Sequence, residues 1–205
     1  MELQGGSMPT DVERWKSEVY GNEIREHLYR FAEEGWDAIP DDESDAWFER
    51  FKWWGLYQQR NGQESYFMMR IGTPNGVLEP GQTKVVADIA KEYASGPATN
   101  PEFGDAYVDW TTRQSIQLHW LKIEDIPEIF EKLEANGLST QQACGDSWRN
   151  IVGNPMAGKA PEFVDALPVI HELNDRFKGN EDHSNLPRKW KVSVTGAPDG
   201  SGQGD

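Results

Sequence analysis

The sequence predicts an α+β fold, on the evidence of its hydrophobic periodicity and its aromatic content. Strand patterns at residues 66–71, 107–110 and 116–121 alternate with helical patterns at residues 85–93 and 125–137. The chain of 205 residues is long enough for one large domain or two small ones, and its nine Trp, eight Phe and six Tyr supply apolar area for a core. We therefore expect a folded, aromatic-rich protein.

Helical periodicity occupies the first part of the chain. Apolar residues recur at steps of three and four, with a break near Gly21, and they are Val12, Trp15, Val19, Ile24, Leu28 and Phe31. Residues 38–44 are acidic and predict a turn, and residues 51–60 carry more aromatic side chains than strand alternation needs. These segments predict a helical and aromatic-rich N-terminal extension over residues 1–60.

The central region, residues 61–145, has the most regular pattern. Its first strand ends in a turn at residues 73–76, and Asp125 with Glu128 predicts a capping box at the start of its second helix. Gly137 predicts a left-handed cap at the end of that helix. A short strand at residues 138–143 would complete β-α-β-β-α-β, the split βαβ or ferredoxin-like arrangement.

The last part of the chain, residues 146–205, is less regular. Residues 151–158 predict a loop rich in Gly and Pro, and residues 163–177 predict a helix broken at Pro168. A strand follows at residues 192–194, and residues 197–205 have the composition of a linker. We expect this part to begin a separate α/β domain.

The charge balance narrows the classes of partner. The chain has 20 Lys and Arg against 35 Asp and Glu, a net charge of -15. This balance fits an acidic surface that stays soluble in concentrated salt, and it also fits an ordinary acidic cytosolic protein. Nucleic acid is excluded as a partner because the chain lacks a broad basic face. The first residues carry no apolar signal region and no run approaches eighteen apolar residues, so we expect no membrane partner and a cytoplasmic location.

A basic segment near the end of the chain stands out against this acidity. Arg188, Lys189 and Lys191 fall within four positions, and strand geometry projects Lys189 and Lys191 from one face. Two ammonium groups on one face repel each other unless an anion or carboxylates lie between them. On these residues alone, an anion clamp and a solvated basic edge strand are equally favoured.

Three arginines add to this signal. Arg70, Arg113 and Arg149 each lie within or at the end of an extended segment. Any one of them is more often part of a structural ion pair with a carboxylate. Because the planar guanidinium group binds anions at two points, three such arginines together with the lysine pair favour a convergent anion pocket.

Taken in order, these segments resemble the ferredoxin-dependent sirohaem nitrite and sulfite reductases. The similarity runs from about residue 15 to residue 196, and the single motifs are weak while the ordered set is specific. The resembling stretches are residues 53–57, 67–70, 74–76, 111–114, 125–128, 133–138, 149–150, 153–158 and 185–191. The resemblance implies a ferredoxin-like half-domain over residues 61–145, followed from residue 146 by the first part of the sirohaem and iron–sulfur binding domain.

The resemblance also implies an activity, with its cofactors and partners. It implies the assimilatory six-electron reduction of nitrite to ammonium, or of sulfite to sulfide, at a sirohaem coupled to a [4Fe–4S] cluster that reduced ferredoxin supplies with electrons. Arg70 and Arg149 fall on the family's substrate-binding Arg positions, and Lys189 falls on a Lys position. Lys191 falls where nitrite reductases usually carry Asn and sulfite reductases carry Lys. The positions implied to bind the sirohaem are Thr111, Arg113, Gln117 and Asn150.

The cysteine content departs from the family pattern. Four cysteines hold the cluster in the family's second half, whereas this chain has only Cys144, which also excludes an internal disulfide. We expect the chain to be the N-terminal portion of such an enzyme, inactive without the missing C-terminal half and binding no cluster alone. The alternative is a non-catalytic acidic ferredoxin-like module that docks a separate cysteine-bearing subunit.

Two residues and the choice of substrate remain open. Cys144 is interpreted as core filling, with a place facing the haem pocket beside Tyr57 as the alternative. His119 shares a strand face with Gln117, and an ordinary sheet histidine is favoured over one that approaches the cofactor. Lys191 and His119 favour sulfite, whereas the salt-adapted character of the chain and the overlap of the two activities favour nitrite.

Overall fold

The computed structural model describes residues 10–59, 65–96, 106–183 and 185–198. The residues beyond 198, which belong to the predicted terminal linker, lie outside the described residues. No helix in these ranges combines the length and the apolar character needed to cross a membrane.

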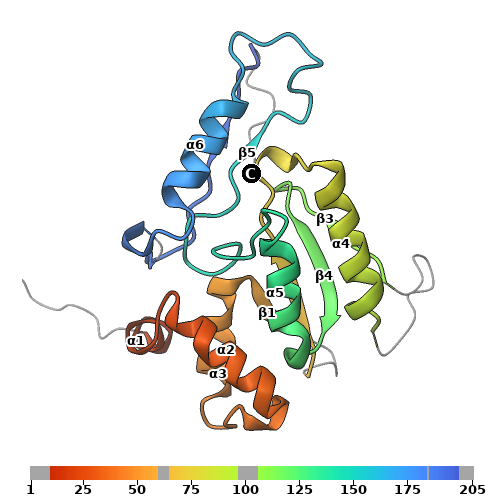
Figure 1. Cartoon of the computed structure of the whole chain (residues 1–205). Coiled ribbons are helices and arrows are strands. Elements are labelled where there is room, and N and C mark those ends of the chain that lie inside the picture. The colour runs from red at the N-terminus through yellow and green to blue at the C-terminus, as the bar shows by residue number, and fades with distance from the viewer. Residues whose placement is uncertain (1–9, 60–64, 97–105, 184, 199–205) are drawn as a thin grey trace, which may run out of the picture.

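A four-stranded antiparallel sheet forms the centre of the molecule (Figure 1). Its strands are β1 (Leu56–Gln58), β2 (Phe67–Ile71), β3 (Asp109–Trp110) and β4 (Ile116–Leu121), in the order β1-β2-β4-β3. Burial alternates along β2, where Phe67, Met69 and Ile71 are buried, as period-two side-chain geometry requires. The predicted strands at residues 66–71 and 116–121 are thereby confirmed, whereas β1 was not predicted.

Two helices follow the strands in the order of the ferredoxin-like arrangement. They are α4 (Pro80–Tyr93) and α5 (Ile126–Glu134), which pack against each other beside the sheet (Figure 1). The core formed between them and the sheet includes Ile89, Leu118 and Phe130, each at most 2% exposed. The α+β, ferredoxin-like fold class is confirmed.

The N-terminal helices extend this core. They are α1 (Asp11–Glu18), α2 (Glu23–Glu34) and α3 (Ser44–Phe51), with short 3-10 turns at Trp36–Ala38 and Lys52–Trp54. The predicted break between the first two helices is confirmed, because Gly21 lies between them with a φ of +62°. Fully buried Phe31 and Phe51 pack edge to face and join α2 and α3 to the sheet through Phe67.

The predicted capping box at Asp125 is wrong. Asp125 ends a 3-10 turn (Ile123–Asp125) that continues directly into α5, so its side chain caps no amide of the helix. A capping box occurs instead at the start of α4, where the Glu79 amide donates to the Gln82 side chain at 3.0 Å. Gly137 has a φ of +70°, which confirms the left-handed cap after α5.

Two further expectations need correction. The strand predicted at residues 138–143 is reduced to one antiparallel bridge, from Ser139 to Gly72, because the chain then turns and the Gln142 amide donates to the Trp53 carbonyl at 2.6 Å. The helix predicted at residues 163–177 is not broken at Pro168. It begins there, as α6 (Leu167–Phe177), because a proline in the first turn gives up no helical hydrogen bond.

A second, smaller unit follows the sheet in sequence. In it β5 (Val152–Gly153) pairs in parallel with β6 (Ser193–Val194), and α6 covers a small core of Ile151, Ala166 and Ile170. Short 3-10 turns stand at Pro74–Gly76 and Glu181–His183. The Asn75 amide donates to the Ile151 carbonyl at 3.0 Å, which ties the turn after β2 to the strand β5. The space between the two units is where the candidate site lies.

Candidate functional site

A cavity of about 330 Å³ lies between the sheet and the smaller unit. Arg70 reaches it from β2, and the turn between β3 and β4 supplies Arg113. Arg149 comes from the loop before β5, and Lys189 and Lys191 come from the segment before β6. The other lining residues are Tyr57, Thr111, Thr112, Ser115, Ala143 and Asn150, so none of the described residues that line the cavity is acidic.

Strand alternation positions Arg70. Its neighbours Met69 and Ile71 point into the core, so the Arg70 side chain projects from the opposite face of β2. Gln117 lies directly opposite on β4, and with its amide oxygen turned toward Arg70 it accepts from Nη2 at 2.6 Å and from Nε at 3.3 Å. The guanidinium carbon also lies 5.7 Å from the centre of the Tyr57 ring. These neutral partners orient the charge without cancelling it.

The side chains of Arg113 and Asn150 each donate a hydrogen bond to the other residue's backbone carbonyl. The Arg113 guanidinium donates to the Asn150 carbonyl at 3.0 Å and to the Val192 carbonyl at 3.3 Å. The Asn150 side-chain amide donates in return to the carbonyls of Arg113 and Thr73, both at 2.9 Å. The Asn150 Oδ1 atom is buried and makes no hydrogen bond within the described structure. Burial, followed by the nearby Arg149 charge, lowers the pKa of Arg113.

Arg149 is fixed by its own loop. Its guanidinium donates to the carbonyls of Gly145 and Ala143, each at 3.0 Å, and its backbone amide donates to the Trp190 carbonyl at 2.9 Å. Carbonyl oxygens hold the planar group in place but leave its positive charge uncompensated. The charge is therefore available to an anion in the cavity.

Lys189 is an exposed residue of the cavity wall and is held through its backbone. Its backbone amide donates to Asp146 Oδ1 at 3.1 Å, while Lys189 and Lys191 both line the cavity. The charges of Arg188 and then Arg149 lower the pKa of Lys189, with smaller contributions from burial and Lys191. Mutual repulsion of this kind is relieved when an anion enters.

The cavity brings together most of the predicted site residues. They are Arg70, Thr111, Arg113, Arg149, Asn150, Lys189 and Lys191. Gln117 is the exception, because it supports Arg70 and does not line the cavity. Thr112, Ser115 and Ala143 line the cavity but were not predicted as site residues, and Tyr57 was predicted only as a possible neighbour of Cys144. A prediction of β1 would have placed Tyr57 beside β2 and thus beside Arg70.

Cys144 is fully buried, as its interpretation as core filling requires. Burial raises the pKa of the thiol and also that of the Tyr57 hydroxyl. Both groups are therefore protonated near neutral pH.

His119 has partners within the sheet. Its Nε2 atom lies 2.8 Å from Asp109 Oδ2, its Nδ1 atom lies 3.4 Å from the Gln59 side-chain nitrogen, and it is not among the lining residues. This arrangement agrees with the favoured interpretation of an ordinary sheet histidine.

Two parts of the chain match known protein-family models. Residues 57–99 and 101–136 match the nitrite/sulfite reductase ferredoxin-like half domain, and residues 144–204 match the nitrite and sulphite reductase 4Fe-4S domain. The chain belongs to the nitrite and sulfite reductase family. The resemblance read from the sequence is thereby confirmed.

Several members of the nitrite and sulfite reductase family cover nearly the whole chain. The assimilatory ferredoxin-dependent nitrite reductase of Haloferax mediterranei is 53% identical over 197 residues, which are 96% of this chain and 34% of that protein. Sulfite reductase [ferredoxin] 1 of Mycolicibacterium paratuberculosis is 36% identical over 86% of this chain and 32% of its own length. The chain thus spans about a third of the length of the curated relatives it matches.

Solved structures of the family agree with the fold. The structure of the Mycobacterium tuberculosis NirA protein superposes with a TM-score of 0.78 at 31% identity, over 92% of this chain and 35% of that one. Dissimilatory sulfite reductase I superposes with a TM-score of 0.52 at 14% identity, over 97% of this chain and 49% of that one, and at that identity it shows the fold alone.

The family supports sirohaem and a [4Fe–4S] cluster as the cofactors, and the two fit this chain differently. The carboxylates of a sirohaem match a cavity lined by five cations and no acid among the described residues. A [4Fe–4S] cluster needs four thiolates, and the chain has one cysteine. Within the described ranges no group of three or more His, Cys, Asp or Glu side chains is placed to hold a metal.

Proposed function

We propose that this chain forms the anion-binding part of an assimilatory ferredoxin-dependent reductase that converts nitrite to ammonium or sulfite to sulfide with six electrons. The observation that carries the proposal is the cavity with Arg70, Arg113, Arg149, Lys189 and Lys191 in its wall. Five cations around one cavity in a chain of net charge -15 repel one another, and an anion offsets that cost.

Four cations would bind the substrate. Arg70 and Arg149 are held by neutral partners, so they present rigid two-point donors that orient an oxyanion. Lys189 and Lys191 close the cavity from the segment before β6. As N–O or S–O bonds break, negative charge builds on the leaving oxygens, and fixed cations stabilise it.

Protons for the reduction would also come from this group. The cations around Lys189 lower the pKa of its ammonium group, and an ammonium ion with a lowered pKa is a better proton donor. The Lys189 side chain is exposed, so water can return the proton.

Thr111 and Arg113 would bind the cofactor's carboxylates, Asn150 would hold the Arg113 turn beside the cofactor, and Gln117 would act through Arg70. A bound sirohaem would supply the iron at which the substrate is reduced. The four cluster thiolates would come from polypeptide outside these residues, because only one cysteine is present. Reduced ferredoxin is the proposed electron donor. The cytoplasm is the proposed location.

Separate observations support nitrite and sulfite as the substrate. Lys191 lines the cavity and supports sulfite, whereas His119 does not line it and no longer adds to that argument. The 53% identity to a relative described as a nitrite reductase supports nitrite. Steady-state rates with each anion on the complete enzyme decide between them.

Replacement of Lys189 by Met tests the proposed function. Lys189 is exposed and its ammonium group supports no other part of the described structure, so Lys189→Met removes one charge with little effect on folding. We expect the KM for nitrite or sulfite to rise about tenfold or more, since one charged hydrogen bond is lost. Thermal unfolding should be unchanged.

Lys159→Met is the matched control. Lys159 is also an exposed lysine, but it does not line the cavity. An equal KM for Lys189→Met and Lys159→Met, at saturating cofactor content, contradicts a role of the cavity in anion binding and favours the non-catalytic docking module.

A further inference from the structure

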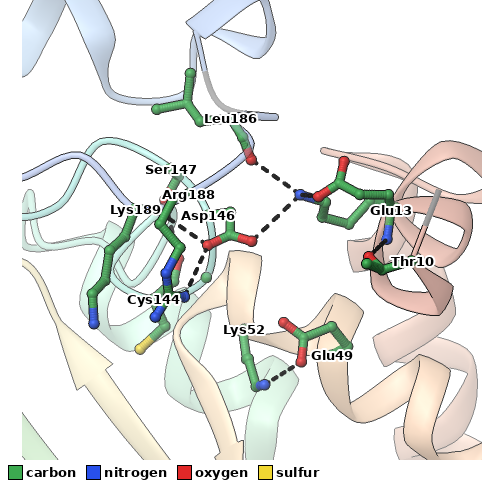
Figure 2. Close-up of polar contacts among 12 residues, drawn as sticks. Thr10, Glu13, Glu49, Lys52, Cys144, Asp146, Ser147, Leu186, Arg188 and Lys189 are labelled. Carbon is green, nitrogen blue, oxygen red and sulfur yellow. Dashed lines mark hydrogen bonds and ion pairs between the residues drawn. The ribbon is translucent and has the colours of Figure 1, made fainter. Parts of the chain in front are cut away.

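One carboxylate, Asp146, lies behind the cations of the cavity and contacts two neighbouring segments. Its Oδ1 atom accepts from the Lys189 backbone amide at 3.1 Å and lies 3.5 Å from Arg188 Nη1. Its Oδ2 atom lies 3.4 Å from the ammonium group of Lys16, on α1. Figure 2 shows these contacts converging on Asp146, whose side chain is only 12% exposed. Asp146 is not among the residues that line the cavity.

The contacts of Asp146 begin a longer pairing of two chain segments. The Leu186 amide donates to the Asp146 carbonyl at 2.9 Å, and the Trp190 amide donates to the Ser147 carbonyl at 3.0 Å. The Arg149 amide donates to the Trp190 carbonyl at 2.9 Å, and Trp148 and Trp190 form a parallel bridge. The segment that carries Lys189 is therefore laid along the segment that carries Arg149. Within this pairing, the Lys189 amide donates its hydrogen bond to the Asp146 side chain.

Lys16 connects the first helix to the same place. Its ammonium group donates to the Leu186 carbonyl at 3.0 Å, lies 2.6 Å from Glu13 Oε1, and contacts Asp146. The Lys16 side chain is 12% exposed, which is far less than a solvated surface lysine. Through Lys16, α1 is fixed to both segments of the pairing.

We propose that Asp146 is a positioning residue that sets the place and the charge of Lys189, and that Lys16 holds this carboxylate and the start of the paired segment in position. The inference rests on the proposed function only in that Lys189 is taken to bind the oxyanion. Asp146 acts in two separable ways. Its oxygen fixes the Lys189 backbone, and its negative charge opposes the cations that face Lys189.

The charge effect has a definite sign. The groups that face Lys189 are Arg188, Arg149 and Lys191, which lower the pKa of its ammonium group, and Asp146, which raises it. Neutralising Asp146 therefore lowers that pKa further. Lys189 then loses its proton, and with it the attraction for an anion, at a lower pH than in the wild-type protein.

Three replacements separate the two effects in the complete polypeptide. Asp146→Ala removes both the acceptor and the charge, Asp146→Asn keeps an acceptor for the Lys189 amide but removes the charge, and Asp146→Glu keeps the charge. Asp88→Asn is the matched control, since Asp88 forms an exposed ion pair with Lys84 on α4. Lys16→Met tests the tether, with Lys84→Met as its control.

Hydrogen exchange of residues 185–191, measured by mass spectrometry with no anion added, tests the placement. We expect Asp146→Ala to speed exchange about tenfold and Lys16→Met about threefold, because buried hydrogen bonds are lost, while Asp146→Asn stays near the wild-type rate. Wild-type exchange in both Asp146→Ala and Lys16→Met overturns the placement. Equal acceleration across the whole chain also overturns it, because that result reports general loss of stability.

Kinetics of the cofactor-loaded enzyme test the charge. We expect Asp146→Ala to raise the KM for nitrite or sulfite about tenfold, and Asp146→Glu, which keeps the negative charge, to leave the KM closer to the wild-type value. For Asp146→Asn, the KM should begin to rise at a lower pH than in the wild type, a shift that a purely structural role would not produce. An unshifted pH profile overturns the charge effect.

A different outcome separates the proposed function from the placement of Lys189. If the wild type fails to turn over either anion while Asp146→Ala still speeds hydrogen exchange of residues 185–191, the proposed function fails and the placement of Lys189 stands.

Discussion

At the scale of single residues, the cavity is defined by how its cations are held. Arg70 is oriented by Gln117, and Arg149 is oriented by the carbonyls of its own loop. Neutral partners of this kind fix geometry without offsetting charge. A structural ion pair would do the opposite, as Arg50 and Glu18 do at 2.7 Å. An arginine with neutral partners keeps its charge available to an anion, whereas the charge of Arg50 is offset by the Glu18 carboxylate.

Lys191 is the residue at which substrate preference can be tested. Near neutral pH sulfite is a mixture of its monoanion and its dianion, whereas nitrite is a monoanion, so removal of one cation weakens binding of the sulfite dianion more than binding of nitrite. We expect Lys191→Asn to lower the ratio of kcat/KM for sulfite to kcat/KM for nitrite by about tenfold, which corresponds to about 1.4 kcal/mol. Steady-state assays with both anions measure the ratio. No change in the ratio, with Lys159→Asn as the control, would show that Lys191 does not discriminate.

At the scale of elements, β1 and its preceding glycine bring Tyr57 and Arg70 together. Gly55 follows a 3-10 turn with a φ of +80°, and its carbonyl accepts from the Arg70 amide at 2.8 Å. A Cβ atom at Gly55 would lie 2.7 Å from the carbonyl oxygens of both Arg70 and Thr140. The position therefore requires a glycine for its backbone conformation and for its close contacts.

Replacement of Gly55 by Ala tests this element. We expect Gly55→Ala to lower the free energy of unfolding by about 2–3 kcal/mol, because of the left-handed backbone and the close carbonyls. Gly81→Ala is the control, since a Cβ atom at Gly81, in the first turn of α4, meets nothing within 4 Å and should raise the stability by about 0.5 kcal/mol. Chemical denaturation measures both changes. Equal stability of Gly55→Ala and Gly81→Ala would contradict the described turn.

Elements also mark where sequence patterns succeed and where they fail. The strands β2 and β4 and the helices α4 and α5 follow from periodicity, because one face of each is buried. The strand β1 does not, since a three-residue strand is too short to show alternation and exists through its pairing with β2. The Asp125 capping box fails because the chain enters α5 from a 3-10 turn.

At the scale of the whole molecule, a cluster of cations lines one cavity of an acidic chain. The net charge is -15, yet the lining of the cavity contains five cations and, among described residues, no acid. The family resemblance selected most of these residues from the sequence, but the pairing of residues 146–149 with residues 186–190 joins segments far apart in the chain. No local pattern in the sequence reveals the role of Asp146 or Lys16. Tertiary contacts alone place them.

The most direct measurement is a crystal structure of the complete, cofactor-loaded protein with nitrite or sulfite bound. The central claim is that the cations of the cavity bind the substrate anion. It predicts anion oxygens within hydrogen-bond distance of the guanidinium groups of Arg70 and Arg149 and the ammonium group of Lys189. The claim is contradicted if the anion lies elsewhere and carboxylates from the remaining polypeptide occupy these three groups.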